Sequence, residues 1–420
     1  MKWRIGRSSW AIPATYAAFA LAIGILLPRL EYRLPFDLRF GISSASAVAI
    51  YSAVATGTMT LLAIVFSLTF VMVQFSATVY SPRLVLWLSE DTLISHALGI
   101  NTGAFLYSLS AIAWVDRNNV QGVSLAGAVV AMVWLVASMG AFIALIKRIA
   151  ALQVSRMLAF TGDRGRQVIA TLYANDRPFS EDGHDTGVDR TPSQVVAHHG
   201  RPRVVQAIDA SALLKLAGAA NTRIDVAVAV GDTVMESTPL IRVHGRGPAI
   251  AEHALTSAIH VGDQRTFEQD PQYAIRLLVD IAIRALSPAI NDPTTAVQAL
   301  DEIGDLLLRL GRTSLATAPL RDAAGVVRVT IPMPTWDDFL RLAFDEICAY
   351  GSSSIQVMRR MNALLSELVR ALPEPRRAAL GYWQHRLEGA INRSFVDLEA
   401  RRDALVRDPQ GIGVSRRSAA

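Results

Sequence analysis

Uncharged polar side chains recur at helical spacing in an apolar segment of the first third of the chain. Thr56, Thr60, Ser67, Gln74 and Thr78 are four or seven residues apart, so an α-helix places them near one stripe of its surface. Hydroxyl and amide groups so arranged can replace part of an ion's hydration shell along a water-filled path. The alternative is a helix interface, at which small and polar residues permit close approach in lipid.

The next apolar segment carries a second set of polar side chains. Asn101 and Ser108 lie seven residues apart and are further candidates for the pore or the helix interface. His96 is readily ionisable and lies one turn inside the end that we predict to be cytoplasmic. We predict His96 and Arg83 as candidate gate or coupling residues. The alternative for His96 is an interfacial hydrogen bond to one of two nearby carboxylates.

Four apolar runs must position these residues. The runs cover residues 11–28, 47–78, 93–115 and 123–147, and no charged side chain occurs between Arg39 and Arg83. A helix needs about 20 apolar residues to cross the hydrocarbon of a bilayer, and the runs lack the alternation of barrel strands. We therefore predict an α-helical integral membrane domain with four transmembrane helices over residues 1–148, with the lipid bilayer as its partner.

Basic residues set the expected orientation of these helices. Lys2, Arg4 and Arg7 precede the first run, and Lys147 and Arg148 follow the fourth. Cytoplasmic segments are enriched in lysine and arginine. Although the first outer loop also holds arginines, we expect both termini to be cytoplasmic.

The remainder of the chain predicts a cytoplasmic α+β domain. We expect a coupling helix over residues 149–178 that glycines at 162 and 165 interrupt, and a turn-rich linker over 179–195. A β module over 196–247 and a helical α+β part over 248–407 follow, with a disordered tail over 408–420. The fold class is thus a helical membrane domain followed by a cytoplasmic domain with a β module and a helical C-terminal part.

Composition excludes several classes of protein. The single cysteine, Cys348, leaves no intramolecular disulfide framework. Basic residues are interleaved with acidic ones through the soluble part, and the membrane flanks and the Arg416-Arg417 tail explain the net charge of +5. We therefore expect no nucleic-acid partner. Phosphate loops, nucleophile elbows and zinc-protease motifs are missing from the sequence, so we do not expect an enzyme.

The β module resembles a known sandwich. Val228 to Val234 predict two strands joined by a Gly-Asp turn, and Pro239 to Val243 predict a closing strand. This order is similar to that of the biotinyl/lipoyl hammerhead. Domains of that type present a lysine for modification, whereas Lys215 lies in a helical pattern. We therefore expect no covalent cofactor and no other cofactor.

A cluster of polar residues follows the β module. Asp280 lies four residues from Arg276 and from Arg284, a spacing that predicts ion pairs along a helix. Asn291 and Asp292 precede Pro293 and are predicted to cap a second helix. The alternative is a polar site for a small ligand or ion, although no metal is assigned. Six carboxylates would be available to it: Glu268, Asp270, Asp280, Asp292, Asp301 and Glu302.

The same region carries a family resemblance. The block Arg265 to Asp270, the block Leu278 to Ala296 and the Ser81-Pro82-Arg83 element resemble a bacterial family of predicted membrane proteins, domain of unknown function 2254. The resemblance covers about residues 1–400 and implies the family's fold and a bacterial inner-membrane location. It implies no activity.

Two functions remain open. The polar stripes favour a homo-oligomeric ion channel or transport-related protein that its cytoplasmic domain gates. The alternative is a non-conducting scaffold or signalling receptor, in which the stripes pack helices and the cytoplasmic domain binds a ligand or partner.

Overall fold

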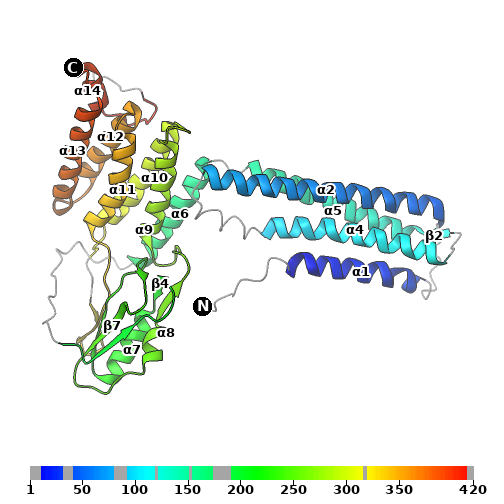
Figure 1. The fold of residues 1–420 in the computed structure, drawn as a ribbon, viewed down its shortest axis with the longest axis horizontal. Coiled ribbons are helices and arrows are strands. Elements are labelled where there is room, and N and C mark those ends of the chain that lie inside the picture. The colour runs from blue at the N-terminus through cyan, green and yellow to red at the C-terminus, as the bar shows by residue number, and fades with distance from the viewer. Residues whose placement is uncertain are drawn as a thin grey trace. The chain divides into compact units, whose positions relative to one another are not determined.

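The computed structural model describes residues 11–31, 41–79, 92–118, 122–150, 154–173, 191–315 and 319–413. The chain divides into two units, Met1–Gln153 (unit 1) and Val154–Ala420 (unit 2). Figure 1 labels helices and strands of both units.

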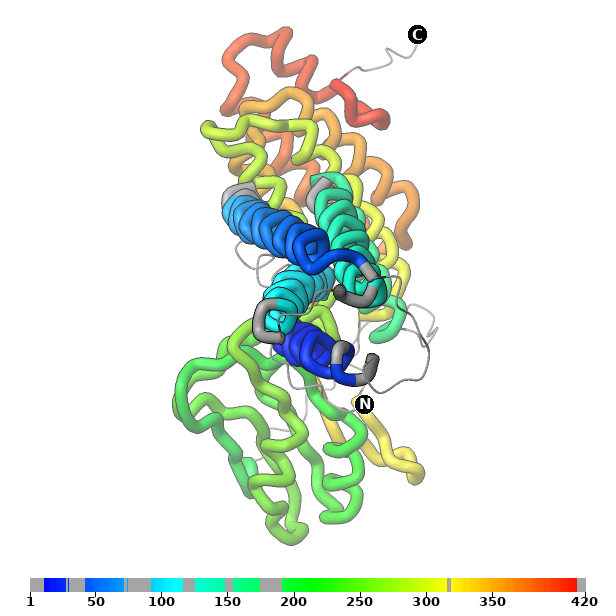
Figure 2. The backbone as a smooth tube through the Cα atoms, turned by 90° about the vertical axis from the view of Figure 1, so that its right-hand side faces the viewer, coloured from blue at the N-terminus to red at the C-terminus, as the bar shows by residue number. Residues whose placement is uncertain are grey.

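The described part of unit 1 is a helical bundle with a short β-ribbon. Its elements are α1 (Ala11–Glu31), β1 (Gly41–Ser43), α2 (Ser44–Val79), α4 (Thr92–Asn118), β2 (Gly122–Ser124) and α5 (Leu125–Ala150). The strands β1 and β2 pair antiparallel directly before α2 and α5. Helix α4 packs against each of the other three helices, and Figure 2 shows it between them.

The apolar runs of the sequence correspond to these helices. Residues 44–71 of α2, 92–115 of α4 and 125–147 of α5 are long and apolar enough to cross a membrane. The apolar part of α1, Ala11–Leu27, is shorter, because the last turn of α1 contains Arg29 and Glu31. Three candidate spans are therefore present in the described residues, and the fourth stays a prediction. With 36 residues, α2 is about 54 Å long.

Close backbone approach holds α1 against α4. A Cβ at Gly99 would lie 2.4 Å from Cδ2 of Tyr16 on α1. One at Gly103 would lie 3.4 Å from the backbone oxygen of Tyr16 and 2.8 Å from Cη2 of Trp134 on α5. Tyr51 and Tyr107, both almost fully buried, meet edge to face with their ring centroids 6.4 Å apart. Small residues let the helices approach, and aromatic rings fill the space between them.

The described part of unit 2 contains two sheets and a group of helices. The strands are β3 (Gln194–Ala197), β4 (Arg203–Ile208), β5 (Arg223–Val226), β6 (Thr233–Val234), β7 (Pro239–His244), β8 (Ile259–Gly262), β9 (Leu320–Arg321) and β10 (Val327–Thr330). The helices are α6 (Val154–Leu172), α7 (Ala210–Ala220), α8 (Glu252–Ser257), α9 (Pro271–Ala285), α10 (Pro293–Gly311), α11 (Trp336–Gly351), α12 (Ile355–Ala371), α13 (Glu374–Ser394) and α14 (Leu398–Leu405).

The sheets extend beyond the β module that the sequence predicts over residues 196–247. The larger sheet has the strand order β3-β7-β5-β10-β9, and the smaller has the order β6-β4-β8. Strand β3 starts inside the predicted linker, of which residues 179–190 lie outside the described residues. Strands β8 to β10 come from residues 248–407, which are predicted as a separate helical α+β part. The sequence does not indicate that β10 joins the larger sheet, because its partner β5 lies more than 100 residues earlier and pairs with it in parallel. Lys215 lies in α7, as expected.

Helix α6 corrects the predicted coupling helix. Gly162 and Gly165 lie inside α6 and do not interrupt it. A Cβ at Gly162 would lie 1.9 Å from Oε2 of Glu302, and one at Gly165 would lie 2.8 Å from Cδ1 of Leu306. These glycines therefore allow α6 to pack closely on α10. Residues 151–153 and 174–178 of the predicted coupling helix lie outside the described residues.

The start of the predicted disordered tail is ordered. Asp408 is completely buried, and its carboxylate accepts hydrogen bonds from the backbone N–H groups of Gln410, Gly411 and Gly413. The Nε2 group of Gln356 on α12 donates to the carbonyl of Gly411 at 2.9 Å. Residues 408–413 thus fold back on α12 through polar contacts that hydropathy does not reveal. Residues 414–420 lie outside the described residues.

Candidate functional site

The polar stripe of α2 is exposed on the isolated chain. Thr56, Thr60, Ser67 and Gln74 all have exposed side chains and lie within about 40° of one another around the helix axis at 100° per residue. The Oγ1 hydroxyl of Thr60 donates to the carbonyl of Thr56 at 2.9 Å. The side chain of Thr78 and the whole of Arg83 lie outside the described residues.

The opposite face of α2 packs into its own bundle. Tyr51, Val54, Thr58 and Val65 are buried, and helical spacing puts them roughly 180° from the stripe. The Thr58 hydroxyl donates to the carbonyl of Val54 at 2.7 Å. The stripe therefore does not form the packing face between α2 and its neighbours in the same chain.

The predicted polar residues of α4 are partly inside the bundle. Asn101 and Ser108 are fully buried and donate to the carbonyls of Ala97 and Ala104 on their own helix, both at 2.8 Å. Oδ1 of Asn101 has no hydrogen-bond partner within the described residues. His96 is exposed, and its Nδ1 lies 3.2 Å from the Tyr16 hydroxyl of α1. Its predicted acidic partners lie outside the described residues.

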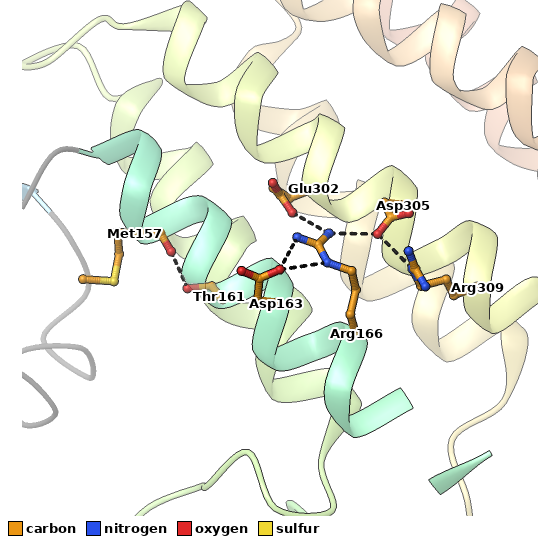
Figure 3. A network of polar contacts seen from close by, with 7 residues as sticks. All are labelled: Met157, Thr161, Asp163, Arg166, Glu302, Asp305 and Arg309. Carbon is orange, nitrogen blue, oxygen red and sulfur yellow. Dashed lines mark hydrogen bonds and ion pairs between the residues drawn. The ribbon is translucent and has the colours of Figure 1, made fainter. Parts of the chain in front are cut away.

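An ion-pair node in unit 2 joins α6 to α10 (Figure 3). The Nη1 atom of Arg166 on α6 lies 2.9 Å from Oε2 of Glu302 and 2.8 Å from Oδ2 of Asp305, both on α10. The Nη2 atom lies 2.9 Å from Oδ1 of Asp163. Oδ2 of Asp305 also accepts from Nε of Arg309 at 3.0 Å. One guanidinium thus serves three carboxylates on two helices.

The pKa shifts of this node follow from burial opposed by ion pairing. Burial alone would lower the pKa of Arg166, but hydrogen bonds to its three carboxylates raise it. Burial raises the pKa of Glu302 against the opposite effect of Arg166. Asp305 is also partly desolvated, yet hydrogen bonds to Arg309 and Arg166 lower its pKa. Arg309 on α10 and Arg166 on α6 together favour the ionised form of Asp305, whereas burial makes Glu302 the more easily protonated of the two carboxyl groups.

The polar residues predicted around the α9–α10 turn act in ion pairs and a helix cap. Asp280 pairs with Arg276. The Nη2 atom of Arg276 lies 2.5 Å from Oδ1 of Asp280 and 2.6 Å from Oε2 of Glu346 on α11. Burial alone would lower the pKa of Arg276, but these two carboxylates raise it. Arg284 lies in the last turn of α9, and its carbonyl accepts from the Ser287 hydroxyl.

The predicted cap of α10 is confirmed for Asp292 only. The Oδ1 atom of Asp292 accepts from the backbone N–H of Thr295 at 3.1 Å, and Pro293 occupies the first turn. Asn291 instead adopts a left-handed backbone with φ of 50°, which asparagine tolerates better than most residues. It turns the chain between α9 and α10 and does not cap the helix.

Most of the acidic residues considered for a ligand site have partners of this kind. Asp270 caps α9 and pairs with Arg265, Asp280 pairs with Arg276, Asp292 caps α10, Asp301 pairs with Arg360, and Glu302 pairs with Arg166. Among the residues that the structure describes, no group of three or more His, Cys, Asp or Glu side chains could hold a metal ion.

The sequence did not single out Arg166. The sequence shows that Glu302 and Asp305 lie on the same side of a predicted helix. It does not indicate that α6 supplies the cation that pairs with them. Pairing across 136 residues depends on how α6 packs.

The helices and the polar contacts define a membrane protein whose apolar helices are followed by a mixed α/β and helical part. The chain belongs to the family described as predicted membrane protein (DUF2254), which matches residues 6–367. The family resemblance of the sequence is thereby confirmed.

The relatives carry no functional description. An uncharacterized protein of Mycobacterium tuberculosis (strain H37Rv) is 28% identical over 411 residues, which cover 92% of this chain and 77% of the relative. An uncharacterized protein of Mycobacterium bovis has the same identity and coverage. No solved structure matches the chain.

Proposed function

We propose that the protein is a homo-oligomeric channel or transport-related protein of the bacterial inner membrane, with four membrane spans, both termini in the cytoplasm and unit 2 as its gate. The placement of the α2 stripe carries this proposal. Thr56, Thr60, Ser67 and Gln74 are exposed on the side of α2 away from its packed face. In a monomer these polar groups would face lipid, whereas a path between subunits would give them water.

The chemistry of the stripe suits cations better than anions. The hydroxyl of Thr60 donates its hydrogen to the carbonyl of Thr56, so its oxygen lone pairs are left for an outside group. The window of α2 over residues 44–71 contains no charged side chain. Hydroxyl and carbonyl oxygens can replace water around a cation at a neutral site.

A non-conducting scaffold or receptor is the second candidate, and a specific observation favours it. Exposed alanines at 49, 53 and 63 share the stripe with the hydroxyl residues, and small residues at such spacing suit tight contact between two helices. In that case the stripe is dry, and unit 2 binds a ligand or partner.

Cysteine accessibility separates the two candidates. Cys348 is the single cysteine of the chain, so Cys348→Ala gives a background without thiols. The native thiol is buried, and burial raises its pKa. Thr60→Cys and Ser67→Cys test the stripe. Met59→Cys is the matched control, because Met59 is 50% exposed but points about 100° away from Thr60.

The measurement is ion flux in liposomes that contain the full-length protein, before and after a charged, water-soluble thiol reagent. For a pore, we expect reaction and altered flux at residues 60 and 67 and neither at residue 59. Gln74→Leu should change the flux without loss of the oligomer. Disulfide crosslinking of Thr60→Cys between subunits, without reagent access or flux, would favour the scaffold.

A further inference from the structure

Exposed aliphatic side chains gather at one end of the helices of unit 2. Ile290 is 44% exposed in the α9–α10 turn, and Ile412 is 65% exposed after α14. Val396, between α13 and α14, and Leu398, the first residue of α14, are 89% and 67% exposed. Exposed aliphatic groups at the ends of several helices need an explanation when they lie together.

Contacts within unit 2 place Ile290 and Ile412 at the end where α6, α10 and α12 begin. Gly162 and Arg166 of α6 lie against Glu302 and Asp305 of α10, in that order. Gly304 and Gly311 of α10 lie against Leu364 of α12 and Leu372 just after it, also in that order. The three helices therefore run parallel and start side by side. Ile290 directly precedes α10. Ile412 follows Gly411, where a Cβ would lie 2.8 Å from Cγ1 of Val297 in the first turns of α10.

Helix α13 brings Val396 and Leu398 to the same end. Helix α13 starts near the end of unit 2 at which α10 finishes, because Nη2 of Arg376 donates to the carbonyl of Thr313 just after α10. It then runs for 21 residues toward the start of α10. Helix α14 is then held on α12 by Asn362, whose Nδ2 donates to the carbonyl of Leu405 at 2.5 Å. Arg359, in the second turn of α12, donates through Nε to the carbonyl of Asp403 on α14, and Figure 1 shows the two helices near each other.

Chain connectivity keeps this end near a membrane. Three residues separate Ala150, the last residue of α5, from Val154, the first of α6. Four Cα steps span at most about 15 Å. The apolar window of α5 extends to Lys147, so the start of α6 stays close to the membrane surface at which α5 ends.

We propose that this end of unit 2 is a lipid-docking surface that rests on the bilayer. Val396, Leu398 and Ile412 insert among the headgroups, as aliphatic side chains of interfacial segments do. The exposed arginines Arg402 and Arg407 add contacts to anionic lipid phosphates. Asp397, Glu399 and Asp403 are exposed acidic residues beside them and moderate this attraction. The inference does not depend on whether the α2 stripe conducts.

The test measures the depth of spin labels in the full-length protein in nanodiscs. In the Cys348→Ala background, labels at Leu398→Cys and Ile412→Cys are compared with labels at Met235→Cys and Val326→Cys. Met235 and Val326 are matched controls because they are 59% and 47% exposed but belong to the sheet region. The collision rate of each label with oxygen reports its exposure to lipid. The collision rate with a water-soluble nickel chelate reports its exposure to water.

We expect the labels at residues 398 and 412 to lie about 5 Å or more inside the interface, and the labels at 235 and 326 to lie in water. The depth should increase when anionic phosphatidylglycerol replaces phosphatidylcholine. Water exposure of all four labels would overturn the proposal. Label-to-label contact between subunits without oxygen enrichment would overturn it as well, and would assign the surface to a second copy.

Discussion

The two units of the protein satisfy buried polar groups in different ways. In unit 1, the side chains of Thr58, Asn101 and Ser108 donate to carbonyls four residues earlier on the same helix. In unit 2, Arg166 and Arg360 bond to carboxylates on other helices. These three side-chain bonds of unit 1 therefore stay within one helix, although the Tyr107 hydroxyl also donates to the carbonyl of Gly127 on α5. The bonds of Arg166 and Arg360 connect different helices of unit 2.

The difference shows what holds each unit together. A hydroxyl that bonds its own helix adds little to the attraction between helices, so the bundle of unit 1 depends on close packing at positions such as Gly99 and Gly103. An ion pair between helices fixes their relative register, and its loss leaves charges without partners in a partly desolvated place. Substitutions in the two units should therefore act by different routes.

The largest effect is expected at Gly99. In Gly99→Leu, the new side chain would occupy the position of the Tyr16 ring and force α1 away from α4, at a cost of about 3 kcal/mol. Detergent-induced unfolding in mixed micelles measures this loss. Gly140→Leu is the matched control, because a Cβ there meets no described atom within 4 Å. Equal losses in the two variants would show that close packing at Gly99 is not decisive.

Removal of the Arg166 charge should have the next largest effect. Arg166→Met leaves Glu302 and Asp305 without their shared cation and should destabilise the α6–α10 contact by about 2 kcal/mol. Arg309→Met is the control, because Arg309 is 50% exposed and should cost less than about 1 kcal/mol. Hydrogen exchange of the α6 and α10 peptides reports the loss. Unchanged exchange in Arg166→Met would contradict a clamp between these helices.

A pH-dependent effect is expected at Asp305. Its pKa is lowered in the folded protein, so its stabilising contribution is present above the ordinary carboxyl value of about 4 and is lost as the pH falls through the lower folded value. Asp305→Asn should therefore be less stable at neutral pH by no more than about 1 kcal/mol. Parallel unfolding curves should converge below about pH 4. A difference that persists in acid would assign the effect to packing.

The smallest effect should come from Ser108. Its hydroxyl bonds only the carbonyl of Ala104 on the same helix in the described contacts, so Ser108→Ala should cost less than about 0.5 kcal/mol. The same micelle unfolding assay applies. A loss as large as that of Arg166→Met would mean that this hydroxyl connects α4 to another element, which would remove the contrast between the units.

Local patterns predicted the elements well and their partners poorly. Apolar runs gave α2, α4 and α5 to within a few residues, because each helix is defined by its own hydropathy. The Asp292-Pro293 pair gave the start of α10 because a cap acts on the next turn. The ion pair of Arg166 with Glu302 was missed because it depends on long-range packing. The unbroken helix at Gly162 was misjudged for the same reason.

The parallel pair of β5 and β10 has a consequence during synthesis. The pairing residues Asp225 and Thr330 leave the ribosome about a hundred residues apart. At 5–20 residues per second, the edge of β5 waits roughly 5 to 20 s for its neighbour. The unpaired edge of a strand can pair with other chains. A nascent chain whose synthesis stops before β10 should therefore depend on chaperones to avoid non-native association through β5.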